Sequence, residues 1–184
     1  VPETTLYGGA PRAAAARAAP EEDGRIVVVF GRGGEGGRLD ALIEAAGAVP
    51  DRAWHVLGPV VGTGSAPQNL HLHGWVTDVR PHLAPAALVV GGAGDGLVTA
   101  VAALGKRFLC LPELRAYDEQ EAKAQALERL GGAVVHRGWP EAGAWANLVT
   151  RGLALDPDVV RRLAEPDALA RTAAAIEALC RETG

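Results

Sequence analysis

The sequence lacks methionine altogether, even at position 1, and it contains only two lysines and two cysteines. A chain without an initiating methionine is expected to begin inside a longer polypeptide or to have been processed. The cysteines have neither the spacing of a zinc site nor the number that a disulfide framework needs, so no structural zinc is expected. Cys110 lies in the apolar run Phe-Leu-Cys-Leu-Pro and is predicted to be a small buried residue, whereas Cys180 falls near the end of a predicted helix.

Surplus positive charge and long apolar runs are also missing. The formal net charge is -4 and the isoelectric point is about 5.7, whereas a protein that binds the nucleic-acid backbone broadly carries an excess of positive charge. Nucleic acid is therefore not an expected partner. No apolar stretch approaches the roughly 18 residues of a membrane span. The first residues lack the basic and then apolar order of a signal peptide, so the expected compartment is the cytoplasm.

What is present is the composition of a globular protein. Of the 184 residues, 48% are hydrophobic and 22% are charged, which suits a single domain or one half of a two-domain enzyme. Residues 1–23 are rich in Ala, Pro, Arg and Glu and are interpreted as a linker or a loosely attached segment. Residues 24–184 are predicted to form one domain.

From Arg25 onward, apolar segments alternate with helical patterns. Predicted strands cover residues 25–30, 52–58, 70–76, 87–92, 107–112 and 133–137, and predicted helices cover 38–49, 78–83, 97–105, 118–132, 140–153 and 158–182. The strands are continuous apolar runs, as in sheets with both faces covered. Right-handed crossovers then give an α/β fold, a doubly wound, Rossmann-like parallel sheet with helices on both faces.

Two glycine-rich loops follow predicted strands. They are Gly31-Arg32-Gly33-Gly34 and the run from Gly91 to Gly96. In an open parallel sheet, ligands bind beyond the carboxyl ends of the strands. Glycine lets backbone N–H groups approach an anion, and the following helix directs its positive end there. The pair of loops therefore predicts a phosphate or diphosphate site, and Asp95 is expected either to cap the next helix or to face the phosphates.

The order of these motifs resembles the C-terminal, donor-binding domain of GT-B glycosyltransferases of family 28, within the UDP-glycosyltransferase superfamily. Within that family, the sequence resembles the enzymes that add N-acetylglucosamine to a lipid-linked peptidoglycan precursor. The resemblance runs from Arg25 to Arg181 and is strongest from residue 87 to residue 135, which include Gly105, Pro112 and the Glu119-Gln120 pair. It implies that the segment 74–79 holds the uracil. The donor-binding set implied by the resemblance is Gly31, Arg32, Gly33, Gly34, Trp75, Val76, Gly92, Ala93, Gly94, Asp95, Gly96, Leu97, Glu119, Gln120 and Lys123.

Four positions depart from the family pattern. Ala100 replaces the glutamate that usually holds the ribose hydroxyls, and Gly92 replaces a frequent histidine. Lys106-Arg107 stands where a proline is usual. Lys123 replaces an asparagine, and it is expected either to meet the donor or to pair with Glu119 one helical turn away.

The resemblance implies the nucleotide-sugar-binding half, with a UDP-sugar as the expected donor, of an inverting glycosyltransferase that transfers a hexose or N-acetylhexosamine to an acceptor hydroxyl. No metal and no cofactor is expected, because backbone amides and helix dipoles stabilise the leaving diphosphate. An acceptor domain before Val1, or a partner subunit in a split enzyme, would supply the catalytic base. Any peripheral contact with a membrane would pass through that missing half. Two alternatives stay open: a non-catalytic relative that serves as a partner module, and a half of a UDP-sugar 2-epimerase-like enzyme.

The remaining candidates are weaker. No Ser-His-Asp order, HExxH or CxxC motif is present. His55, His71 and His73, on predicted strands, are interpreted as hydrogen-bonded structural residues, and His82 and His136 are treated alike. Arg115 and Tyr117, in the loop before Glu119, are expected to face the mouth of the donor site.

Overall fold

Six short strands form one parallel sheet in the computed structural model, which describes residues 21–31, 34, 36–114, 118–165 and 167–182. The strands stand in the order β5-β3-β1-β6-β7-β8, and every neighbouring pair is parallel. Their bounds are β1 (Ile26–Val29), β3 (Trp54–Leu57), β5 (Leu70–Gly74), β6 (Leu88–Gly91), β7 (Phe108–Cys110) and β8 (Val134–Val135). The predicted doubly wound parallel sheet is confirmed.

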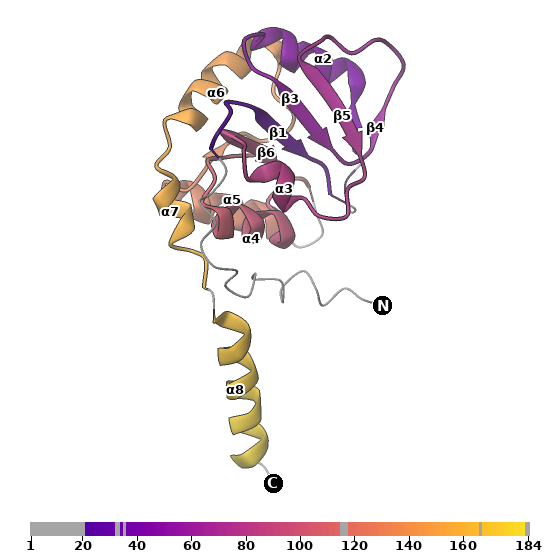
Figure 1. Ribbon diagram of the computed structural model, residues 1–184. Helices are drawn as coiled ribbons and strands as arrows, with labels where there is room; N and C mark the ends of the chain where they lie inside the picture. The colour runs from indigo at the N-terminus through magenta and orange to yellow at the C-terminus, as the bar shows by residue number, and fades with distance from the viewer. Residues whose placement is uncertain (1–20, 32–33, 35, 115–117, 166, 183–184) are drawn as a thin grey trace.

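Helices cover both faces of this sheet (Figure 1). On one face lie α2 (Leu39–Ala48), the 3-10 helix η2 (Ala142–Ala144) and α6 (Trp145–Leu153); on the other lie α3 (Arg80–Leu83), α4 (Asp95–Leu104), α5 (Glu119–Arg129) and α7 (Pro157–Arg161). Successive strand residues point to opposite faces. In β1, Ile26 and Val28 therefore pack in the core under α2 and α6, and Val27 packs in the core under α4 and α5.

An aromatic cluster fills the first of these two cores. Trp54 of β3 and Trp145 of α6 are fully buried and meet edge to face, with ring centroids 5.2 Å apart. Trp139 contacts Trp145 and also stacks on Phe30, which directly follows β1. The residues after β1 and after β8 are thereby joined at the carboxyl ends of their strands.

Glycine ends α4 as predicted. Gly105 adopts the left-handed conformation with φ 58°, and its N–H bonds the carbonyls of Val101 and Ala102, as in a glycine C-terminal cap. The helix starts at Asp95, two residues before the predicted start. Cys110 is fully buried in β7, as expected, and Cys180 is exposed.

The tail of the chain corrects one prediction. Residues 158–182 form two helices and not one: α7 is followed by a separate α8 (Ala168–Glu182). The sequence has Pro166 between them, and proline cannot supply the amide that a continuous helix requires. Helix α8 extends away from the sheet (Figure 1). Each of its side chains within 170–181 is exposed.

Two short strands are absent from the sequence prediction. Strand β2 (Gly37–Arg38) pairs in parallel with β4 (Val60–Val61) in a separate two-stranded sheet. Two residues are too few to give an alternating hydrophobic pattern, so no sequence signal marks them.

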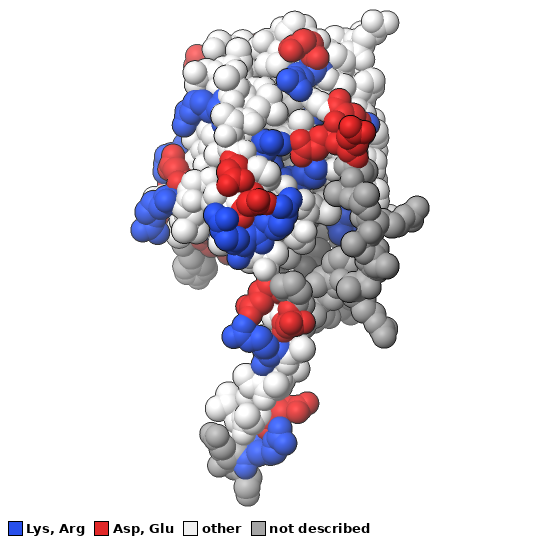
Figure 2. Space-filling model, turned by 60° about the vertical axis from the view of Figure 1, so that its left-hand side comes forward, with Lys and Arg blue, Asp and Glu red and all other residues white. Residues whose placement is uncertain are grey.

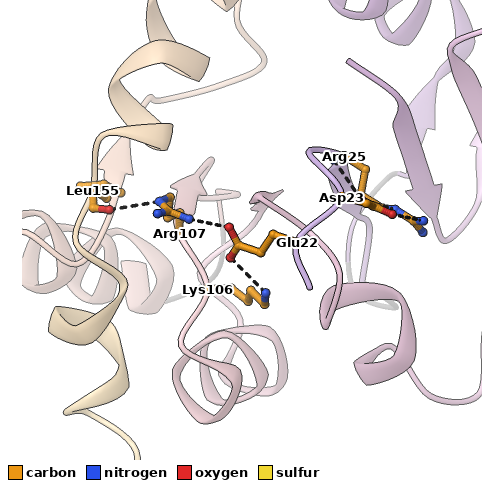
Figure 3. A network of polar contacts seen from close by, with 6 residues as sticks. All are labelled: Glu22, Asp23, Arg25, Lys106, Arg107 and Leu155. Atoms are coloured by element: carbon orange, nitrogen blue, oxygen red, sulfur yellow. Dashed lines mark hydrogen bonds and ion pairs between the residues drawn. The ribbon is translucent and has the colours of Figure 1, made fainter. Parts of the chain in front are cut away.

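Glu22, near the start of the described residues, forms ion pairs with the loop between α4 and β7 (Figure 3). The Glu22 carboxylate accepts hydrogen bonds from Lys106 Nζ at 3.2 Å and Arg107 Nη1 at 2.9 Å. Arg107 Nε also donates to the carbonyl of Leu155, which follows α6. Lys106 and Arg107 precede β7 and Glu22 precedes β1, so these ion pairs lie at the amino ends of the strands.

The described surface has no marked charge segregation on the face that carries α6 and α7, where acidic and basic side chains lie intermixed (Figure 2). No helix within the described ranges is both long enough and apolar enough to cross a bilayer.

Candidate functional site

The strand order reverses its direction at the carboxyl ends of β1 and β6. After β1 the chain turns to β3 on one side, whereas β6 lies on the other side of β1. The loops that follow β1 and β6 therefore leave in opposite directions, which is the point where open α/β sheets bind ligands. Both predicted glycine loops start at this edge. Of the first loop, Gly31 and Gly34 are described, and Arg32 and Gly33 lie outside the described residues.

Two glycines in these loops are not required by packing. A methyl group added at Gly31 or at Gly94 would meet no atom of the described residues within 4 Å, and neither residue has a positive φ. By contrast, a methyl group on Gly91 would lie 2.5 Å from Leu97 Cδ2 and 2.9 Å from the Val29 carbonyl oxygen. Close packing therefore requires glycine at position 91, while no described residue packs against the positions of Gly31 and Gly94.

The amino end of α4 opens on the same edge. Gly94 is the N-cap residue, and the first helical hydrogen bond runs from the Val98 N–H to the Gly94 carbonyl at 3.0 Å. The first amides of a helix have no carbonyl one turn earlier and carry the positive end of the helix dipole. The predicted site residues Asp95, Gly96 and Leu97 form this first turn. The geometry suits an anionic group.

Lys123 modifies the charge at this helix end. Its ammonium, on α5, forms an ion pair with the Asp95 carboxylate on α4. Of the two roles predicted for Lys123, pairing with Glu119 is therefore not what the structure shows. The ion pair offsets the negative charge that Asp95 places at the mouth, so this carboxylate is not an isolated repulsive charge toward a phosphate.

Gln120 faces inward, and Glu119 faces solvent. The Gln120 side chain is buried, and its Oε1 accepts the N–H of Ala93 at 2.9 Å and the N–H of Glu113 at 3.0 Å. Glu119 is exposed at the start of α5. The two residues that the resemblance implies together thus have different surroundings: Gln120 joins two loops, and Glu119 lies open to a ligand.

Glu113 was not singled out from the sequence, yet its carboxylate lies between the glycine loops. A methyl group added at Gly34 would meet Glu113 Oε1 at 2.4 Å, and one added at Gly92 would meet its Cδ at 3.6 Å. Its place in the sequence could have indicated this. Glu113 follows Pro112 just after β7, so it lies at the same edge of the sheet as Gly34 and Gly92. Arg115 and Tyr117, predicted at this mouth, lie outside the described residues.

The segment predicted beside the base lies after edge strand β5. Trp75 is 56% exposed, and Val76 is half-buried against the core under α4. Leu97 and Ala100 of α4 pack on that same core. Segment 74–79 and α4 therefore share one hydrophobic contact region, and Ala100 contributes only a methyl group where the family has a carboxylate.

The histidines form a separate group on β3, β5 and α3. His55 Nδ1 and His73 Nε2 lie 2.9 Å apart in a hydrogen bond. The His71 ring lies 4.7 Å from the His55 ring, and the His82 ring lies 5.1 Å from the His73 ring, measured between ring centroids. Burial, reinforced by the charge of Arg25, lowers the pKa of His55 to about 4 and burial also lowers the pKa of His73. His136, after β8, contacts the carbonyl of Gly138. Within the described ranges no three His, Cys, Asp or Glu side chains are placed to hold a metal ion.

Lys106 and Arg107 do not belong to the candidate site. They lie at the amino ends of the strands, where they contact Glu22. The departure from the family pattern at these two positions therefore affects the contact with Glu22 and not the candidate site.

Comparison with solved structures identifies the fold. The chain is similar to CalG4, the calicheamicin glycosyltransferase, with 23% identity, a TM-score of 0.70 and coverage of 90% of this chain and 46% of that chain. It is similar to MurG of Acinetobacter baumannii, with 20% identity, a TM-score of 0.62 and coverage of 94% and 52%. It is also similar to the glycosyltransferase VinC in complex with dTDP, with 18% identity, a TM-score of 0.60 and coverage of 82% and 39%.

The likeness extends over most of this chain but about half of each of these three glycosyltransferases. No protein-family model and no curated protein sequence matches the chain. At these identities the likeness concerns the fold. The chain has the fold of one half of a GT-B glycosyltransferase, as the sequence motifs predicted.

Proposed function

We propose that this chain is the donor half of a glycosyltransferase, and that it binds the diphosphate of a nucleotide sugar between the loops that contain Gly31 and Gly94. The observation that carries the proposal is that two glycine loops and the amino end of α4 all follow the carboxyl ends of β1 and β6, on either side of the point where the strand order reverses. No described residue lies within 4 Å of a methyl group added at Gly31 or at Gly94, so neither position is filled by packing.

The chemistry follows from the groups at this edge. In glycosyl transfer the bond between the anomeric carbon and the diphosphate oxygen breaks, and negative charge develops on the departing diphosphate. Backbone N–H groups and the dipole of α4 stabilise that charge, and the Lys123 ammonium offsets the opposing charge of Asp95. Exposed Glu119 accepts hydrogen bonds from sugar hydroxyls, and segment 74–79 contacts the base. An inverting transfer would take its base for the acceptor hydroxyl from the other half of the enzyme.

The test is isothermal titration of the chain with UDP, dTDP and GDP, followed by UDP-N-acetylglucosamine. UDP is expected to bind most tightly. Gly94→Asp, which places a carboxylate at the amino end of α4, is expected to raise the Kd at least about tenfold, equal to about 1.4 kcal/mol. Gly47→Asp is the matched control, because exposed Gly47 also has no atom of the described residues within 4 Å of an added methyl group and lies near the end of α2. Equal effects of the two substitutions, or no binding of any nucleotide, would refute the proposal.

The proposed donor site uses no metal ion and no cofactor. Backbone amides and the positive end of the α4 dipole stabilise the diphosphate, so UDP affinity is expected to be the same with EDTA as with added Mg²⁺. A Kd that falls more than about tenfold on adding Mg²⁺ would contradict this part of the proposal.

Ala100 favours a second candidate, a related domain that has lost donor binding and serves as a partner module. Its methyl group packs on the core under α4 and offers no acceptor for ribose hydroxyls. Restoring the family residue with Ala100→Glu separates the two candidates. A gain of UDP affinity from an undetectable level would identify a donor site that has been lost.

A further inference from the structure

Gln120 is unusual among the polar side chains of this fold. In the described part of the chain it is one of two buried polar or charged residues. The other, Lys106, pairs with Glu22 at the amino ends of the strands. A buried amide side chain needs hydrogen-bond partners, because leaving its polar atoms unsatisfied away from water destabilises the fold. The partners that Gln120 has are therefore informative about its role.

One oxygen atom of Gln120 holds two loops. Its Oε1 accepts the Ala93 N–H, from the loop after β6, at 2.9 Å and the Glu113 N–H, from the loop after β7, at 3.0 Å. A carbonyl oxygen has two lone pairs, so both acceptor positions are used within the protein. Neither remains for a sugar hydroxyl.

Glu113 connects Gln120 to a third loop, the one after β1. Its backbone is fixed by Gln120, and its carboxylate lies against Gly34 in the loop after β1. Gln120 thereby connects, directly or through one residue, the loops after three adjacent strands. These loops are the ones that surround the proposed diphosphate.

The entry of α5 supports a fixed placement of Gln120. Asp118, the N-cap residue of α5, is the one non-glycine residue with a positive φ in the described ranges, at 49°. Such a conformation is unfavourable for a residue with a side chain and persists where the surroundings impose it. Asp118 lies two residues before Gln120, so the backbone is constrained close to this side chain.

We propose that Gln120 is a positioning residue, whose side-chain oxygen sets the amide groups of the loops after β6 and β7 for the diphosphate. This inference deepens the proposed function and rests on it. It distinguishes Gln120 from exposed Glu119, which remains the sugar contact in the proposal. Removal of the Gln120 oxygen then weakens binding of the diphosphate, whether or not a sugar is attached.

The experiment compares Gln120→Leu with Gln125→Leu, the same change at an exposed position of the same helix. Titration with UDP and with UDP-N-acetylglucosamine is expected to show that Gln120→Leu raises both Kd values at least about fivefold and by the same factor. Gln125→Leu should change neither. A rise confined to UDP-N-acetylglucosamine would overturn the proposal, because it would identify a sugar contact.

Amide exchange gives a second readout that needs no ligand. The Ala93 and Glu113 amides are expected to be protected in the wild-type chain, to lose protection together in Gln120→Leu, and to regain it in Gln120→Glu, whose carboxylate oxygen can accept both N–H groups. Independent behaviour of the two amides would overturn the proposal. If the wild-type chain binds no nucleotide while both amides respond to Gln120→Leu, the donor-binding function fails and the loop connection stands.

Gly92→Ala provides an independent variant. The added methyl group would lie 2.9 Å from Gln120 Oε1, so the oxygen must move away from the Ala93 N–H. The same joint loss of UDP and UDP-sugar affinity is expected. Unchanged affinity for both ligands in Gly92→Ala, with the Ala93 amide exposed to exchange, would refute the positioning role.

Discussion

Replacing Glu22 by glutamine is expected to destabilise the fold through the buried end of Lys106. The Lys106 side chain is only 6% exposed, and its ammonium lies 3.2 Å from the Glu22 carboxylate. Glutamine keeps the shape of Glu22 but removes the charge that compensates this ammonium. Breaking a buried pair by changing one partner is costly, because the other charge stays buried.

The magnitude follows from the distance and the exposure of both groups. At 3.2 Å and an effective dielectric constant of about 20, two unit charges attract by about 5 kcal/mol. Glu22 is 37% exposed and is shared with Arg107 at 2.9 Å, so water and the second cation reduce this value, and exposed pairs are worth about 0.2–1 kcal/mol. We expect a loss of about 2 kcal/mol for Glu22→Gln. For a chain of this size that lowers the Tm by roughly 4–8 °C.

The assay is urea and thermal unfolding of Glu22→Gln, Lys106→Met and the double variant. Methionine retains the apolar stem of Lys106 without a charge, so Lys106→Met is expected to be nearly neutral. Glu22→Gln should then cost at least about 1 kcal/mol less in the Lys106→Met background. The coupling is expected to fall only in part at about 0.5 M salt, since the Lys106 end of the pair is buried and the Glu22 end is exposed. Exposed Glu21→Gln serves as control. Equal costs of Glu22→Gln in both backgrounds would refute the reasoning.

Three further predictions concern other parts of the fold. The folded state holds the pKa of His55 at about 4, below its ordinary value, and lowers that of His73. The unfolded chain therefore binds more protons, so the free energy of unfolding falls as the pH is lowered from about 7 to about 5. His55→Gln should make this free energy, measured by urea unfolding, depend less on pH. Burial raises the pKa of the Cys110 thiol to about 12, so iodoacetamide at about pH 8 should label exposed Cys180 and leave Cys110 unmodified until the protein is unfolded. Gly58 has φ 105°, and an added methyl group would lie 2.4 Å from the Phe30 carbonyl oxygen; Gly58→Ala should therefore lower the free energy of unfolding by about 2–4 kcal/mol, and a loss below about 0.5 kcal/mol would contradict this.

The sheet could be predicted from the sequence because its strands are short apolar runs that end in glycine or proline. The run from Arg25 to Phe30 and the run before Gly91 are too apolar for an exposed strand, which required helices on both faces. The glycine at 105 marked the end of α4 for a conformational reason that local sequence shows directly. The split of the last predicted helix was missed although Pro166 is visible, because helical spacing on both sides of it outweighed that signal.

The candidate site was predictable in position but not in its contacts. Strand ends and glycines indicated the loops, yet the pairing of Lys123 with Asp95 depends on how α5 lies against α4. Spacing along one helix suggested Glu119 as the partner, since sequence shows only neighbours one turn apart. The inward direction of Gln120 and the position of Glu113 between two loops likewise arise from three strands meeting at one edge.

The first strand of the domain lies in the middle of the sheet, and this determines the order in which the fold can be assembled. Strand β1 pairs with β3 on one side and with β6 on the other. The pairing with β6 closes a loop that contains all of residues 30–87, which is slow because the chain entropy is lost before the contact forms. During synthesis, Val27 and Val29 are made long before the strand that completes their hydrogen bonding, so β1 has an unpaired edge until residue 91 has emerged. Such an edge is a site for wrong pairing between chains, and the shortness of β1, four residues, limits the length of backbone that a second chain can capture.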